Sequence, residues 1–365
     1  MNLPFRIGAP HDEPVVSVDG AFDAPGLNLS HWPGNTTPAD LKHDLSTGIA
    51  LNFARLDPEE RERRAAGCVE VLNNHYDTDG VCSALAVLQP ERALRIQDGL
   101  LEAALAGDFF RAPSERGLAI DATVSRLVDA ERSPLALAGM TDEQRQNTAL
   151  ADALERVPRM LEHGIESETV LWHDMLEAWR SDTRDLQSAV FDDLVHLDYA
   201  VWTGPMGRAS SRDGAGTFDP GRHALWGRTE ADRVLVLGPT AAGTTCRFLL
   251  STVSWFDLVS RTAHARPDLA KLASQLNALE GTDADASTCW RHESMGGASP
   301  ELWFGEAHAS NYEEHADAWL RPSGLDPLVL KARVTDAVRA AWTFPDDDDD
   351  DLSMDDLQLT RGLDS

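Results

Sequence analysis

The segment from Cys68 to Leu88 constrains the fold of this chain more than any other. It opens with a short apolar run, Cys68–Leu72, continues through a polar loop, Asn73–Gly80, and ends in a helical pattern, Val81–Leu88. A buried strand joined by a loop to a helix is a βα unit, and such units build parallel sheets because parallel neighbours need a crossover connection. We therefore expect an α/β fold with a mainly parallel sheet flanked by helices.

Further strand and helix patterns lie on both sides of this unit. Short apolar strands are predicted at Val15–Val18, Leu27–His31 and Leu118–Ile120, and helical periodicity dominates from Thr141 to Leu197. Beyond residue 200 strands and turns prevail, with a hairpin predicted between Trp290 and Phe304. This change of pattern predicts that a second, smaller α+β domain follows the first.

The length of 365 residues also favours two domains, because it exceeds what one hydrophobic core usually covers. We predict an α/β domain over residues 1–200 and an α+β substrate or accessory domain over residues 201–344. Residues 345–365 contain the unbroken acidic run Asp346–Asp351. Such a run cannot offset the entropy of ordering, so we expect a disordered acidic tail.

The charge balance excludes some partners. The chain has 61 acidic residues against 32 Lys and Arg, giving a formal net charge of -29. This field repels phosphates, which argues against a general nucleic-acid-coating surface and against anionic membranes. No apolar stretch reaches the roughly 18 residues of a membrane span. The four cysteines form no Cys-x-x-Cys pair, which favours a reduced, cytoplasmic location.

The polar loop is the strongest candidate for a functional site, because ligands of open α/β sheets bind at the carboxyl ends of strands. Asp77 and Asp79 alternate, so both carboxylates can turn toward one point while Thr78 points away, and His75 precedes them. Two carboxylates and an imidazole suit Mn²⁺ best, with Mg²⁺ or Zn²⁺ possible. Gly80 permits a tight bend there. The alternative is an acidic glycine turn without a ligand.

This segment resembles motif I of the DHH phosphoesterase superfamily, which includes RecJ-type exonucleases, nano-RNases and manganese-dependent inorganic pyrophosphatases. The resemblance covers Val71–Ala86. It implies that His75, Asp77 and Asp79 bind Mn²⁺ in a DHH-like domain over residues 1–200. It also implies a phosphoesterase or pyrophosphatase that hydrolyses a small phosphorylated or nucleotide substrate through a metal-activated water. Together with this loop, the segment from Ser30 to Asn35 is also similar to an uncharacterised prokaryotic family of unknown function.

Only part of the superfamily's metal centre is recognisable. A further aspartate ligand ends the next strand in the superfamily, and Asp121 stands at the end of the predicted strand Leu118–Ile120. Asp121 is equally well explained as a helix cap. The Asp-His-His motif of the superfamily is absent from the sequence. The substitutes are His163, His173 and His196, whose positions are more typical of helix surfaces or packed histidines.

Three residues before this loop are candidates for binding the phosphate of the substrate. His31 ends a predicted strand, and Asn35 and Lys42 lie close by in the sequence. A helix is predicted to follow with Pro38 near its first position, and a helix N-terminus can receive an anion. The alternative is a capped turn over a packed Trp32.

Two other functions fit the same residues. The segment 77–81 also resembles the first motif of haloacid-dehalogenase-type phosphatases, in which the first aspartate is a covalent nucleophile. Against this, Asn73–Tyr76 interrupt the apolar strand, and only Lys271 and Lys331 remain downstream. The other alternative, motivated by the missing Asp-His-His motif, is a non-catalytic DHH-like protein that binds a nucleotide or a protein.

Overall fold

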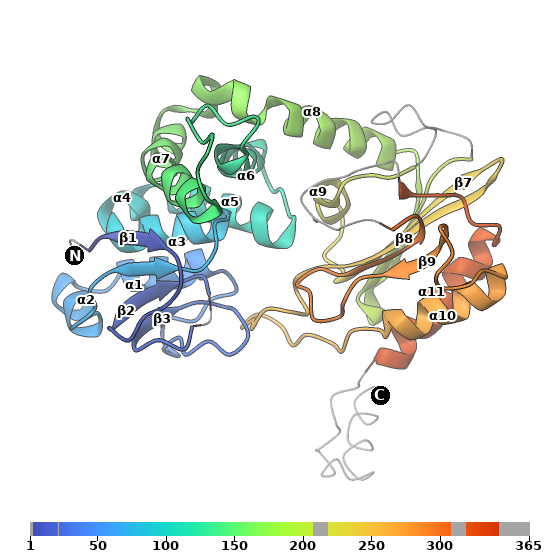
Figure 1. Cartoon of the computed structure of the whole chain (residues 1–365), viewed down its shortest axis with the longest axis horizontal. Coiled ribbons are helices and arrows are strands. Elements are labelled where there is room, and N and C mark those ends of the chain that lie inside the picture. The colour runs from blue at the N-terminus through green and yellow to red at the C-terminus, as the bar shows by residue number, and fades with distance from the viewer. Residues whose placement is uncertain (1–2, 21, 207–217, 308–318, 343–365) are drawn as a thin grey trace, which may run out of the picture.

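Two β-sheets, each with its own helices, organise the computed structural model of the chain (Figure 1). The structure describes residues 3–20, 22–206, 218–307 and 319–342. The predicted α/β class with a parallel sheet is confirmed. The predicted acidic tail, residues 345–365, lies outside the described residues.

Sheet A contains four parallel strands in the order β1-β4-β2-β3. The strands are β1 (Phe5–Ile7), β2 (Val15–Val18), β3 (Gly26–Leu29) and β4 (Val71–Asn73). The central strands β2 and β4 are buried along their whole length, as expected for strands covered on both faces. Because all four strands run the same way, the residues that follow β2, β3 and β4 meet at one edge of the sheet.

The first eight α-helices of the chain surround or extend this sheet (Figure 1). They are α1 (Ser46–Ala54), α2 (Pro58–Arg64), α3 (Thr78–Leu88), α4 (Pro90–Arg95), α5 (Gln97–Phe109), α6 (Glu115–Val128), α7 (Asp142–His163) and α8 (Thr169–Leu186), with a 3-10 turn, η1 (Ile165–Glu168), before α8. Helix α3 completes the predicted βα unit and packs against α1 and α5. Its residues 78–87 are all buried, as expected for a helix that is apolar or small on every face.

The predicted strand Leu118–Ile120 is wrong, because these residues lie inside α6. Ser114 caps this helix by accepting a hydrogen bond from the backbone N–H of Gly117. All three apolar residues are buried in the core of the first half. A short apolar run can belong to a buried strand or to a buried helix, and its sequence does not separate the two.

Sheet B contains six strands in the order β5-β6-β7-β8-β10-β9. They are β5 (Val190–Leu194), β6 (Tyr199–Thr203), β7 (Arg233–Thr240), β8 (Gly243–Leu250), β9 (Cys289–His292) and β10 (Glu301–Gly305). Only β6 and β7 pair in parallel. The remaining helices are η2 (Val195–Leu197), α9 (Arg222–Trp226), α10 (Leu269–Glu280) and α11 (Pro327–Ala341). The predicted hairpin is present as the antiparallel pair β9 and β10.

Sheet B begins earlier in the chain than the sequence predicts. The helical pattern ends at Leu186, and Val190–Leu194 already forms an edge strand. The predicted boundary between residues 200 and 201 therefore falls within β6. After β8, the segment 251–268 returns to sheet A, where the N–H of Asp257 donates to the carbonyl of His31 at 2.8 Å. None of the helices in the described ranges combines the length and apolar character of a membrane span.

Candidate metal centre

Four metal-ligating side chains converge at the edge of sheet A where β2 and β3 end. Asp19 follows β2 in a left-handed conformation with φ of 49°, and His31 comes just after β3. Asp79 lies in the first turn of α3 and Asp108 at the end of α5. Each offers one ligand atom, and these four atoms lie within 4.8 Å of one another. We call these four buried residues the inner group.

A second set, the outer group, consists of Asp19, His75 and Asp77. The His75 Nε2 lies 2.8 Å from an oxygen of Asp77 and 3.3 Å from Oδ2 of Asp19. Oδ1 of Asp19 faces His31 of the inner group at 3.7 Å. Asp19 therefore belongs to both groups. The side chains of His75 and Asp77 are 26% and 28% exposed, so the outer group is on the solvent side.

The tautomer of His31 directs a lone pair at the inner carboxylates. Its Nδ1 lies 2.5 Å from the backbone carbonyl oxygen of Asp44, which can only accept, so Nδ1 carries the proton. Burial lowers the pKa of His31, which favours the neutral ring. Its Nε2 is 3.0 Å from Asp108 Oδ2 and 3.6 Å from Asp79 Oδ2. Histidines that bind metals have this arrangement, with the second ring nitrogen donating to a carbonyl or carboxylate.

Several of these buried atoms have charged or polar neighbours but no hydrogen bond in the described part of the chain. Neither oxygen of Asp19, nor His31 Nε2, nor Asp108 Oδ2 forms a hydrogen bond within the described residues. In the same part of the chain, no Lys or Arg forms an ion pair with the inner group. Burial, with the Asp77 and Asp79 carboxylates, raises the pKa of Asp19 to about 8. Burial also raises the pKa of Asp108 well above its usual range.

These residues fit a divalent cation. Uncompensated buried carboxylates are costly, and a bound cation would supply the missing charge and ligand contacts. The donor set is carboxylate oxygen with imidazole nitrogen, which suits Mn²⁺ and permits Mg²⁺.

The other two aspartates are held by backbone N–H groups. The Asp79 oxygens accept hydrogen bonds from the N–H groups of Ser46 and Thr47, at 2.8 and 2.7 Å, at the start of α1. Asp77 caps α3 by accepting from the N–H of Gly80 at 2.8 Å. Burial opposes the ionisation of Asp77, but His75 and this N–H lower its pKa to about 2.

Position 80 leaves no room for a side chain, so glycine is required there. A Cβ atom there would lie 2.3 Å from the Asn73 side-chain nitrogen and 3.0 Å from Asp77 Oδ1. The absence of a side chain lets the loop after β4 approach the start of α3.

The structure brings the predicted loop residues together, with one correction. Asp77 and Asp79 do not turn toward the same point, because Asp77 belongs to the outer group and Asp79 to the inner group. The reason is that Asp77 occupies the cap of α3, while Asp79 is already inside the helix and faces α1. His31, predicted to bind substrate, lies instead among the candidate ligands.

Asp121 lies beside the two groups but in neither. It is in the middle of α6, where Oδ1 accepts the Thr78 hydroxyl at 2.6 Å and Oδ2 is 3.5 Å from His223 Nε2. Thr78 separates Asp77 from Asp79 in the sequence. The structure therefore places Asp121 where it supports the loop, as a neighbour of the candidate ligands.

Asn35 and Lys42 both contact Asp257, at 3.0 and 2.7 Å, and so join their loop to the segment 251–268. The helix predicted from Pro38 begins only at Ser46. Its start is fixed by the Asp79 carboxylate, a contact between residues far apart in the sequence.

The three substitute histidines are all exposed and belong to neither group: His163, His173 and His196.

The sequence analysis missed Asp19 and Asp108. Asp19 directly follows the predicted strand Val15–Val18 and precedes a glycine, and an acidic residue before a glycine after an apolar strand also marks the loop after β4. Asp108 is an acidic residue in the otherwise apolar run 103–110, which signals a buried carboxylate.

Comparisons with known proteins identify a family without assigning an activity. No curated protein and no solved structure matches the chain. The profile of one family, described as "Family of unknown function (DUF6687)", matches residues 2–349. The chain therefore belongs to this family, whose function is unknown.

Proposed function

We propose that the chain is a metal-dependent phosphoesterase or pyrophosphatase with a DHH-like centre that acts on a small phosphorylated or nucleotide substrate. The observation that carries this proposal is the inner group, in which buried carboxylate oxygens and an imidazole lone pair converge without a Lys or Arg partner among the described residues. If the cluster had only a structural role, pairing its carboxylates with Arg or Lys would make the folded protein more stable than leaving them unpaired.

The inner and outer groups would hold Mn²⁺, or Mg²⁺, with Asp19 contacting both positions. Divalent cations bound there supply Lewis acidity, lowering the pKa of water and neutralising phosphate charge. This local positive charge would also offset the repulsion between a phosphorylated substrate and a chain of net charge -29.

The surrounding residues support this chemistry by fixing and enclosing the ligands. The Asp44 carbonyl holds the tautomer of His31, and Phe256 stacks on the His31 ring with centroids 3.7 Å apart. Trp32 packs against His75 at 4.8 Å and against Trp255 at 4.8 Å. These aromatic rings therefore pack against the rings of both candidate histidine ligands. A substrate would approach the partly exposed outer group.

A covalent phosphoaspartate mechanism is less well supported. The Asp77 carboxylate is engaged by Gly80 and His75. Neither downstream lysine supports that mechanism: Lys271 lies in α10, and Lys331 in α11 pairs with Asp192.

We also propose a cytoplasmic location, in keeping with the four cysteines, all of which are unpaired.

Metal analysis and hydrolysis assays on the same preparations test the proposal. The full chain is stripped with EDTA, reloaded with Mn²⁺, and assayed with bis-p-nitrophenyl phosphate, pyrophosphate and dinucleotides. We expect bound Mn²⁺ and Mn²⁺-dependent turnover for the wild type, and loss of both for Asp19→Asn. Asp174→Asn is the matched control, because this aspartate is a surface residue with a 65% exposed side chain.

Two outcomes would contradict the proposal. A wild-type protein that binds no Mn²⁺ would refute the metal centre. Binding of Mn²⁺ without turnover of any of these substrates would refute the catalytic function and favour a non-catalytic binding protein.

A further inference from the structure

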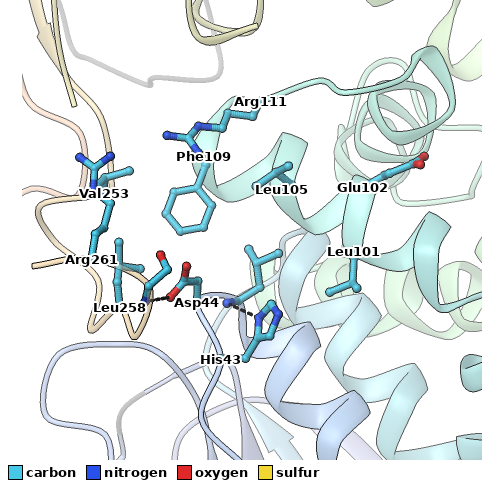
Figure 2. A pocket seen from close by; sticks show the side chains of 12 residues that line it. His43, Asp44, Leu101, Glu102, Leu105, Phe109, Arg111, Val253, Leu258 and Arg261 are labelled. Atoms are coloured by element: carbon cyan, nitrogen blue, oxygen red, sulfur yellow. Dashed lines mark hydrogen bonds between the residues drawn. The ribbon is translucent and has the colours of Figure 1, made fainter. Parts of the chain in front are cut away.

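A cavity of about 310 Å³ lies beside the metal centre and is lined by residues 43–45, helix α5 with Arg111, and the segment 251–268 (Figure 2). Its volume is at the lower end of the range for small-molecule sites. Most of its wall is apolar, formed by Leu45, Leu101, Leu105, Phe109, Val253 and Leu258.

Two arginines meet at one end of this cavity (Figure 2). Arg111 and Arg261 both donate to the backbone carbonyl of Glu230, at 3.1 and 3.3 Å. Arg261 is neutralised by Asp198, 2.5 Å away. Two guanidinium groups on one carbonyl repel each other unless further negative charge is nearby.

Arg111 lacks such a partner in the part of the chain that the structure describes. It forms no ion pair there, and its Nε is buried without a hydrogen bond. The carboxylates of Glu230, Asp198 and Asp232 act on Arg111 from a distance, and none of the three forms an ion pair with it among the described residues. The chain has nearly two acidic residues for every basic one, so a half-buried arginine without an ion pair is unexpected.

The acidic residues of the cavity wall already have hydrogen-bond or ion-pair partners within the protein. The Asp44 carboxylate accepts the N–H groups of Val259 and Ser260, at 2.7 and 3.0 Å. Glu102 accepts the Ser114 hydroxyl at 2.6 Å and pairs with Arg116 at 2.8 Å. The unmet requirement of the cavity is therefore an acceptor for Arg111.

The cavity is distinct from the metal centre but touches residues that support it. The wall includes Asp44, whose carbonyl holds His31, and Phe109, which follows Asp108 in the chain. The ligand atoms of His31 and Asp108 face the inner group, and neither residue lines the cavity.

We propose that this cavity binds a small amphipathic anion, an alkyl or aryl chain that ends in a carboxylate or a phosphate. The anionic group pairs with Arg111, and the apolar chain lies along the leucines and Phe109. Burial of the chain supplies affinity, and the charge-assisted hydrogen bonds fix its orientation.

Isothermal titration calorimetry on the full chain tests this site with octanoate, hexyl phosphate and the neutral control octanol. We expect octanoate or hexyl phosphate to bind, and the tighter of the two identifies the anionic group. Arg111→Gln should weaken this binding by about tenfold or more, the usual effect of losing a hydrogen bond to a charged group. The matched control is Arg132→Gln, a change at a surface arginine whose side chain is 57% exposed.

Leu105→Trp provides a second variant, which fills the cavity without changing its charge and should abolish binding. Melting curves establish that each variant is folded. Asp19→Asn should bind the same anion as the wild type, so the outcome is independent of the metal centre. The site is refuted if neither anion binds, if octanol binds as tightly as octanoate, or if folded Arg111→Gln binds like the wild type.

Discussion

Replacing Asp19 with asparagine should stabilise the metal-free protein while destroying its metal centre. Asp19 is fully buried, and neither of its oxygens accepts a hydrogen bond from the described residues. Burial raises the pKa of Asp19 from its usual 3.8 to about 8. Between these pH values the folded protein retains a proton that the unfolded chain releases, so the free energy of unfolding falls as the pH rises.

The size of the effect follows from this pH window. Each pH unit above 3.8 lowers the free energy of unfolding by about 1.4 kcal/mol, which sets a ceiling of about 4 kcal/mol at about pH 7. Structural relaxation and water entry reduce the penalty of a buried charge. We therefore expect Asp19→Asn to raise the free energy of unfolding of the metal-free protein by about 2–4 kcal/mol at about pH 7. At about pH 4.5 the gain should be about 1 kcal/mol or less.

Urea unfolding in EDTA, monitored by tryptophan fluorescence at both pH values, measures how much Asp19→Asn raises the free energy of unfolding at each pH. Asp285→Asn changes an exposed aspartate that forms no ion pair within the described residues, and it should show a difference near zero at both pH values. Destabilisation of the metal-free protein by Asp19→Asn at neutral pH, or a gain that does not increase with pH, would contradict this expectation.

Three further predictions concern metal binding, local packing and buried charge. Mn²⁺ at about 100 times its dissociation constant should raise the free energy of unfolding of the wild type by about 2.7 kcal/mol; EDTA should reverse this in a melting experiment. Gly80→Ala would place a Cβ 3.0 Å from Asp77 Oδ1, so calorimetry should record Mn²⁺ affinity reduced by about 10–100-fold. Arg247→Leu leaves Asp219 and Glu301, each 2.6 Å from the guanidinium, buried without this partner. Urea titration should then show a loss of about 3–5 kcal/mol.

Local patterns predict the fold class and one part of the candidate metal centre. The βα unit at Cys68–Leu88 and the flanking strands are visible because buried strands read as apolar runs. The loop with His75 and Asp77 is identifiable for a related reason, since a dense polar segment directly follows such a run.

The remaining parts depend on contacts between distant segments. Asp108 lies at the end of a helix, and only the packing of α5 beside sheet A brings it to His31. The start of α1 at Ser46 depends on hydrogen bonds to Asp79, which no local rule supplies. The sequence alone does not distinguish a ligand such as His31 from a substrate-binding residue, because both roles use the same side chain at the same strand end.

The returning segment 251–268 joins the candidate metal centre to the second half of the chain. All six candidate ligands precede residue 109, yet Phe256 covers the His31 ring and the N–H of Val259 satisfies Asp44. A fragment ending before sheet B would keep each candidate ligand but lose the contacts that Phe256 and Val259 make with His31 and Asp44. Recombination between relatives, or grafting of this centre onto another scaffold, would therefore have to carry both halves together.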